Sequence, residues 1–268
     1  MRVAVIQMNS GADVSANLAT ADRLLGEAAQ DGCALAVLPE NFALMPVKSR
    51  DKAAHGETSG EGPIQTFLAA AARRHGLWII GGSIPMASPE PERVYGACPV
   101  FTDSGALEGC YRKIHLFDVK LPGSSESYQE SWSMYAGDDP VTVATPAGRM
   151  GLTICYDLRF PELYRQLVDD GATAFSVPAA FTQPTGKAHW RVLLRSRAIE
   201  NLAYVFAAGQ YGEHADGRST YGHSMIIDPW GKVLAEAPDA ECFVAAEVDP
   251  GLPETLRRDF PALSNRRL

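Results

Sequence analysis

The stretch Gly151-Leu152-Thr153-Ile154-Cys155-Tyr156-Asp157-Leu158-Arg159-Phe160-Pro161-Glu162 carries the pattern on which the predicted fold depends. It opens as a strand, because Leu152 and Ile154 alternate with a polar residue. It ends as the start of a helix, because proline suits the first helical position and Glu162 suits the first turn. Cys155 therefore lies where a strand runs into a turn close to helical amides. In such a place a thiol can be exposed and its thiolate favoured.

Strands and helices alternate along the chain on both sides of this stretch. Apolar positions three and four apart predict helices over residues 15–30, 62–75, 161–170 and 189–203, the first capped by Ser15. Alternating or continuous apolar runs predict strands over residues 2–8, 34–40, 77–86, 141–146, 149–155, 172–181, 204–212 and 241–249, with hairpins at 94–113 and 224–237. Residues 114–140 form a long polar stretch without periodicity. Because no linker-like composition separates these elements, we expect one α/β domain over residues 1–268.

Composition argues against several classes of protein. The net charge of −8 and the lack of a basic stripe with interleaved aromatic residues argue against nucleic-acid binding. No apolar run is long enough to span a bilayer, and the opening MRVAVIQM reads as a strand and not as a signal peptide. The five cysteines are odd in number and never spaced as CxxC, so we expect a reducing, cytoplasmic setting.

Motifs for metal or nucleotide chemistry are incomplete. No histidine pair has the spacing of a zinc site, and no glycine-rich stretch completes a dinucleotide or phosphate loop. We interpret His115, His189 and His223 as packing or hydrogen-bonding residues.

Three ionisable residues stand at the ends of predicted strands, where open α/β sheets place their sites: Glu40, Lys113 and Cys155. Taken singly, Glu40 and Lys113 are explained as solvated edge residues and the cysteine as a small core residue. Together they are what thiol-based acyl transfer needs. A thiol of pKa about 8.5 requires a base, and a carboxylate can supply it. A cation beside the carbonyl oxygen stabilises the oxyanion. Sequence spacing alone does not show that the three meet in space.

Three motifs in one order give the chain its resemblance to a known family. They are LPENF (38–42), YRKIHLF (111–117) and ICYDLRFPE (154–162). The chain resembles the nitrilase superfamily of carbon–nitrogen hydrolases over nearly its whole length. The resemblance implies a four-layer αββα sandwich, homodimers or larger homo-oligomers, and no metal or organic cofactor.

The resemblance also implies roles for individual residues. Cys155 would be the nucleophile, Glu40 the general base and acid, and Lys113 the oxyanion-stabilising residue. The backbone amide of Tyr156 would be the second oxyanion donor. Glu130, in the polar stretch, would match a second glutamate that holds substrate and lysine in place; its alternative is a solvated loop acid.

The residues around the cysteine point to a branch of this superfamily. True nitrilases have Trp-Glu after the nucleophile, whereas this chain resembles the small-amidase branch that includes omega-amidases and deaminated glutathione amidases. The segments AHW (188–190), RSRAIE (195–200), YGHSM (221–225) and DPWG (228–231) are most similar to the latter. Residues 182–184 depart from both patterns.

The substrate implied is a small amide with a 2-oxo acid end, in the first place deaminated glutathione cleaved to 2-oxoglutarate and cysteinylglycine through a thioester. Arg159 would clamp its carboxylate, unless it forms a salt bridge to Glu162 or another acid. Phe181 and Thr182 are expected to line the pocket. The alternatives are an omega-amidase acting on 2-oxoglutaramate, an N-carbamoyl amino-acid hydrolase, a non-catalytic scaffold and a redox thiol protein.

Overall fold

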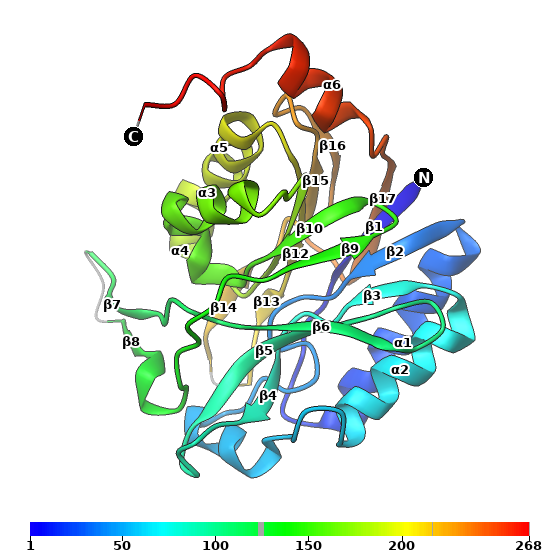
Figure 1. Cartoon of the computed structure of the whole chain (residues 1–268). Coiled ribbons are helices and arrows are strands. Elements are labelled where there is room, and N and C mark those ends of the chain that lie inside the picture. The colour runs from blue at the N-terminus through cyan, green and yellow to red at the C-terminus, as the bar shows by residue number, and fades with distance from the viewer. Residues whose placement is uncertain (123–125, 216, 268) are drawn as a thin grey trace.

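Two mixed β-sheets pack face to face, and helices cover their outer faces (Figure 1). The structure is a computed structural model that describes residues 1–122, 126–215 and 217–267. Helices α1 (Val14–Gln30) and α2 (Pro63–His75) cover the first sheet, and α3 (Pro161–Asp169) and α5 (Arg191–Asn201) cover the second. This arrangement confirms the predicted α/β class and its four-layer αββα sandwich.

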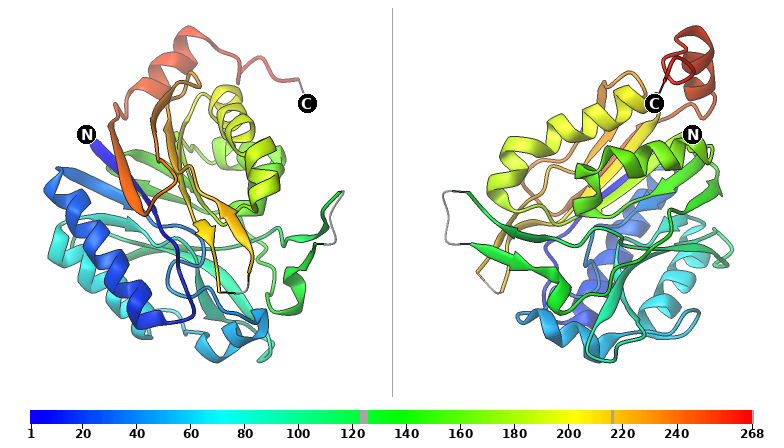
Figure 2. Two further views of the ribbon diagram at one scale, coloured as in Figure 1. Left: turned by 180° about the vertical axis from the view of Figure 1, so that it is seen from behind. Right: turned by 60° about the vertical axis from the view of Figure 1, so that its left-hand side comes forward.

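The first sheet comes from the first half of the chain and one late strand. Its order is β17-β1-β2-β3-β5-β4, with β6 on the other side of β5. The strands are β1 (Arg2–Gln7), β2 (Cys33–Val37), β3 (Trp78–Ile80), β4 (Ile84–Ala87), β5 (Val94–Phe101), β6 (Leu107–Arg112) and β17 (Cys242–Glu247). The late strand β17 lies antiparallel beside β1, which joins the end of the chain to its beginning (Figure 2).

The second sheet has the order β16-β15-β12-β11-β10-β9. Its strands are β9 (Thr142–Thr145), β10 (Gly148–Leu152), β11 (Ala174–Ala179), β12 (Tyr204–Gly209), β15 (Met225–Ile227) and β16 (Val233–Glu236). The central strands β10, β11 and β12 run parallel, so their carboxyl ends open on one edge. This edge receives the quoted stretch around Cys155.

Alternation along β1 shows how one strand serves two layers. Val3 and Val5 join the core between the sheets, where Leu152 and Phe206 of the second sheet also lie. Ala4 and Ile6 point the other way and pack with buried residues of α1 and α2. Successive side chains of a strand point to opposite faces, so this one apolar run fills both sides of its sheet.

The remaining elements are short. They are η1 (Ser49–His55), β7 (Asp118–Lys120), β8 (Ser127–Gln129), η2 (Glu130–Trp132), η3 (Cys155–Arg159), α4 (Gln183–Thr185), the π-helical η4 (Gly186–Trp190), β13 (Tyr211–Glu213), β14 (Ser219–Tyr221) and the C-terminal α6 (Leu252–Asp259). The hairpin β7–β8 projects from the body on the left of Figure 1. In the described part of the chain, no helix has the length and apolar character needed to cross a membrane.

Several predicted elements differ from the observed ones. The cap of α1 is Asp13, whose side chain accepts from the Ala16 backbone N–H, and not Ser15. The polar stretch 114–140 contains the hairpin β7–β8 and η2, although residues 123–125 lie outside the described part. The helix predicted over residues 189–203 is α5, which begins at Arg191 and is preceded by α4 and η4. The strand predicted over residues 241–249 is β17, which pairs with β1 in the first sheet. Local sequence does not indicate this pairing.

The strand predicted over residues 77–86 is broken into β3 and β4 at Gly81-Gly82. Gly82 has a φ of +61°, and a Cβ atom built there would lie 2.2 Å from the carbonyl oxygen of Pro39. Only glycine accommodates both the left-handed backbone and this close approach. The break thus lets the turn that carries Glu40 pack directly on the backbone of Gly82.

Candidate active site

A cavity of about 610 Å³ opens where β2, β6 and β10 end. Glu40 follows β2, Lys113 follows β6, and Cys155 follows β10 as the first residue of η3. All three line this cavity together with Glu130, the first residue of η2. The structure therefore brings together four side chains that are far apart along the chain.

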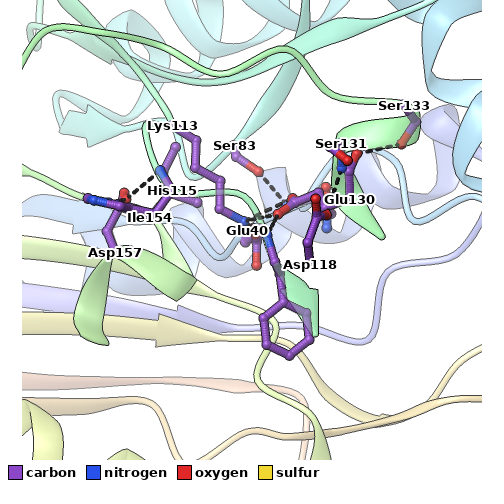
Figure 3. A network of polar contacts seen from close by, with 12 residues as sticks. Glu40, Ser83, Lys113, His115, Asp118, Glu130, Ser131, Ser133, Ile154 and Asp157 are labelled. Atoms are coloured by element: carbon purple, nitrogen blue, oxygen red, sulfur yellow. Dashed lines mark hydrogen bonds and ion pairs between the residues drawn. The ribbon is translucent and has the colours of Figure 1, made fainter. Parts of the chain in front are cut away.

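The ammonium of Lys113 lies between two carboxylates (Figure 3). Its Nζ donates to Glu40 Oε1 at 2.9 Å and to both oxygens of Glu130 at 2.9 Å. The lysine side chain is only 2% exposed. Burial by itself would lower the pKa of Lys113, but the carboxylates of Glu130 and Glu40 outweigh it and raise that pKa well above its ordinary value. The ammonium therefore stays charged at any physiological pH.

Glu130 is held by the loop that follows Lys113. Its Oε2 accepts the backbone N–H of Phe117 at 2.6 Å, in addition to the lysine. The residue begins η2, and its carbonyl accepts the backbone N–H of Ser133 at 3.1 Å. Its carboxylate is thus directed into the cavity by the polar stretch, and is not a solvated loop acid.

Cys155 occupies a strained turn and is buried. Its φ is +51°, in the left-handed region that non-glycine residues rarely adopt, and such strain is concentrated at functional sites. Burial raises the pKa of the thiol well above its ordinary value, and the Glu40 carboxylate adds to the increase. The Lys113 ammonium and a hydrogen bond from the Ala180 backbone act in the opposite direction but do not outweigh them. The prediction of an exposed cysteine with a favoured thiolate is therefore wrong, because the thiol is buried and lies beside the Glu40 carboxylate.

Asp157 joins the turn of Cys155 to the loop of Lys113. It is fully buried, and its Oδ2 accepts the backbone N–H of Ile154 at 2.8 Å and the Tyr111 hydroxyl at 2.8 Å. Its Oδ1 lies 3.1 Å from the backbone N and 2.7 Å from Nδ1 of His115 (Figure 3). One carboxylate thereby fixes the residues next to both Cys155 and Lys113. Sequence reasoning missed it, although an acid two residues after the cysteine, inside a buried turn, was the available signal.

The turn of Glu40 is held from both halves of the chain. Asn41 has a φ of +57°, and its backbone N–H donates to Ser83 Oγ at 2.9 Å. Its side-chain Oδ1 accepts from Lys52 Nζ at 2.8 Å. From the second sheet, the buried Gln210 donates through Nε2 to the Glu40 carbonyl at 3.0 Å. Lys52 gave no signal in the sequence, because a lone lysine between predicted helices reads as a solvated residue.

The predicted substrate-contacting residues all line the same cavity. The Arg159 guanidinium lies 5.3 Å from the centre of the Phe181 ring and 3.3 Å from His189 Nδ1. Among the described residues no carboxylate pairs with it, so the alternative salt bridge to Glu162 is absent. Phe181 and Thr182 are each 7% exposed and follow β11. Tyr156 follows Cys155 in η3, so its backbone N–H belongs to a first helical turn, where amides lack partners within the helix.

The three histidines make the polar contacts expected of them. His115 pairs with Asp157 and stacks on Phe160 with ring centres 3.7 Å apart. His189 contacts Arg159, and His223 Nδ1 lies 3.5 Å from Glu236. In residues 1–122, 126–215 and 217–267, no group of three or more histidine, cysteine or carboxylate side chains is arranged to hold a metal ion.

Comparison with known proteins gives one consistent result. Residues 2–258 match the model of the carbon–nitrogen hydrolase family. A protein of Yersinia enterocolitica named deaminated glutathione amidase is 40% identical, with 99% of this chain and 92% of that protein covered. The NitFhit protein of C. elegans superposes with a TM-score of 0.91 at 36% identity, over 99% of this chain and 65% of its own. Nit3 of Saccharomyces cerevisiae, described as a member of branch 10 of the nitrilase superfamily, gives a TM-score of 0.88 at 33% identity, over 100% and 97%.

Asp157→Asn tests the link between the two loops. An amide NH₂ in place of either oxygen would face N–H or O–H donors, so buried donors lose their acceptor. We expect the free energy of unfolding in urea to fall by about 2 kcal/mol or more. The exposed Asp139→Asn is the matched control, with a change within about 0.5 kcal/mol. Equal stability of the two variants would show that Asp157 does not hold the turn.

The raised pKa of Cys155 is tested by titrating thiolate absorbance in the ultraviolet. A pKa raised by burial means that the thiol stays protonated at and beyond the ordinary thiol value of 9.0. The difference spectrum between wild type and Cys155→Ala should therefore show no thiolate signal below that pH. A thiolate signal at neutral pH would mean that Lys113 dominates over burial and Glu40.

Proposed function

The chain belongs to the carbon–nitrogen hydrolase family, the nitrilase superfamily, and we propose that it hydrolyses the side-chain amide of deaminated glutathione. The products are 2-oxoglutarate and cysteinylglycine. The observation that carries the proposal is the meeting of Cys155, Glu40 and Lys113 in one pocket of about 610 Å³. The name of the Yersinia relative supports the choice of substrate.

In the first half of the reaction, Cys155 forms a thioester. Its Sγ attacks the amide carbonyl carbon while the thiol proton passes to Glu40, which is needed because the thiol is protonated in the free pocket. The carbonyl electrons move onto oxygen, and that oxyanion is stabilised by the Lys113 ammonium and the Tyr156 backbone N–H. When the carbon–nitrogen bond breaks, Glu40 returns the proton to the departing amine.

In the second half, water releases the acid. Glu40, again ionised, takes a proton from a water molecule as its oxygen attacks the thioester carbonyl. The same two donors hold the second oxyanion. Collapse breaks the carbon–sulfur bond, gives 2-oxoglutarate, and returns the proton from Glu40 to the sulfur of Cys155. Glu130 is a positioning residue in this scheme, because its two contacts to Nζ hold the lysine in place.

The acyl end of the substrate fits the wall formed by Arg159. Its guanidinium can donate two parallel hydrogen bonds to a carboxylate, and the Phe181 ring beneath it keeps the group oriented. Thr182 offers a hydroxyl at the end of the same strand. We assign the 2-oxo acid end of the substrate to this wall.

We further propose that two copies of the chain associate through an apolar face over α5 and α6. Four large side chains are exposed there: Val192, Ile199, Trp230 and Phe260. The rings of Trp230 and Phe260 touch edge to face with centres 5.6 Å apart, and Gly231 packs against Ile199. Large exposed apolar side chains that gather in this way are typical of protein–protein contact.

We also propose a cellular setting and a domain extent for the enzyme. All five cysteines are free thiols and one of them is the proposed nucleophile, which supports a reducing, cytoplasmic setting. The core shared by the two sheets supports one domain over residues 1–268.

Incubation with defined substrates tests the function. Wild type should release cysteinylglycine and 2-oxoglutarate in equal amounts from deaminated glutathione. Cys155→Ala should lose activity by at least about 10³-fold, because no nucleophile remains. Cys242→Ala is the matched control, because Cys242 lies on β17 and is not among the described residues that line the cavity, and it should keep full activity. Ammonia release from 2-oxoglutaramate without cleavage of deaminated glutathione would identify an omega-amidase instead. Carbon dioxide with ammonia from an N-carbamoyl amino acid would identify an N-carbamoyl hydrolase.

Sedimentation velocity tests the proposed self-association. Trp230→Glu places a charge at the centre of the apolar face, so a wild-type dimer should become a monomer. Leu107→Glu, on the β5–β6 hairpin, is the control and should sediment as wild type does. A monomeric wild type, or a Trp230→Glu variant that stays dimeric, contradicts this interface.

A further inference from the structure

The charge of the cavity is opposite to the charge of the chain. The chain carries a net charge of −8, yet the described residues that line the cavity include six basic and only three acidic side chains. The basic ones are Lys48, Arg50, Lys52, Lys113, Arg159 and Arg218, and the acidic ones are Glu40, Glu126 and Glu130. Lys113 pairs with Glu40 and Glu130, and the other described charged residues of the lining are five basic side chains and the acidic Glu126. A pocket of this sign concentrates anions.

These basic groups reach the cavity from two sides. Arg159 ends η3, the short helix that Cys155 begins, and so belongs to the second sheet's side. The other side is formed by η1 and the residue before it, which contribute Lys48, Arg50 and Lys52. In Figure 1 this segment lies below β4, whereas α3 and α4, which follow η3 and β11 of the other side, lie in the upper half. Arg218 precedes β14, and its charge acts on Lys52. The cavity thus has one basic side chain, Arg159, on the wall assigned to the acyl end of the substrate. Several basic side chains lie on another wall.

Lys52 is the member of this second group that is best placed to bind a ligand. It is half-buried, and its Nζ donates to Asn41 Oδ1 at 2.8 Å. An ammonium has three donors, and Asn41 is the one hydrogen-bond acceptor that the described residues provide for it. Burial lowers its pKa, while the carboxylates of Glu130 and Glu40 act against that change. A desolvated ammonium with unused donors pairs strongly with a carboxylate.

We propose that Lys52, together with Arg218 of the same cavity, binds a carboxylate on the leaving-amine side of the substrate, opposite the carboxylate that Arg159 binds on the acyl side. This inference rests on the proposed amidase function and adds a specificity determinant to it. The enzyme then prefers amides whose leaving amine carries a carboxylate. Deaminated glutathione has one at its glycine end, whereas 2-oxoglutaramate, which releases ammonia, has none.

The test compares deaminated glutathione with its C-terminal amide, which has the same shape but no charge at the glycine end. Wild type should prefer the carboxylate by about 10- to 100-fold in kcat/KM. Lys52→Met should abolish this preference through a higher KM for deaminated glutathione, and Lys52→Arg should keep most of it. Lys232→Met, an exposed lysine in the turn before β16, is the control for a general change in charge and should keep the full preference.

Other outcomes overturn the inference in distinguishable ways. An equal loss of kcat on both substrates in Lys52→Met would mean that Lys52 only holds the Glu40 turn through Asn41. A wild type that cleaves both substrates equally well has no such subsite. A wild type that cleaves neither contradicts the proposed function and this inference together. Should Lys52→Met fail to fold, Arg218→Met provides the same comparison, and an unchanged preference in it rejects the proposal.

Discussion

The ion cluster of Lys113 with Glu40 and Glu130 is the constraint on which the site depends. The buried charge of Lys113 is very costly unless it is paired, and here two other segments supply its partners. The strand end at Glu40, the strand end at Lys113 and the helix start at Glu130 must therefore come together in the folded state. The Glu40 carboxylate of this cluster also helps burial to raise the pKa of the neighbouring Cys155 thiol, whereas the Lys113 ammonium acts to lower it.

Two strained turns present the reactive groups, and a set of buried polar contacts holds each of them. Cys155 and Asn41 both have a positive φ, and neither is glycine. Asp157 holds the first turn through the backbone next to the cysteine, and Ser83 and Gln210 hold the second. Such contacts offset the cost of the strained backbone and keep the carboxylate, the ammonium and the sulfur in reach of one carbonyl group. The stable sandwich below allows this strain at its edge.

Much of the site could be predicted, because its residues lie next to clear local signals. Cys155, Glu40 and Lys113 each follow an apolar strand, and the three motifs around them occur in one order. The protonation state of the thiol could not be predicted, since it depends on burial and on Glu40, which is distant in sequence. Lys52 and Asp157 were missed for the same reason: their partners, Asn41, Tyr111 and His115, are brought near only by folding.

By itself, the sequence determined most of the strands and helices and the turn at Cys155, because apolar periodicity, proline and glycine act over a few neighbouring residues. It also determined the chemistry on offer: a thiol, two acids and a lysine. Only the tertiary structure decided that β17 joins the first sheet, that Gly82 admits the turn of Glu40, and that the cavity is basic in an acidic protein. These features come from contacts between distant segments, whose energies depend on burial and distance, and no local pattern records either quantity.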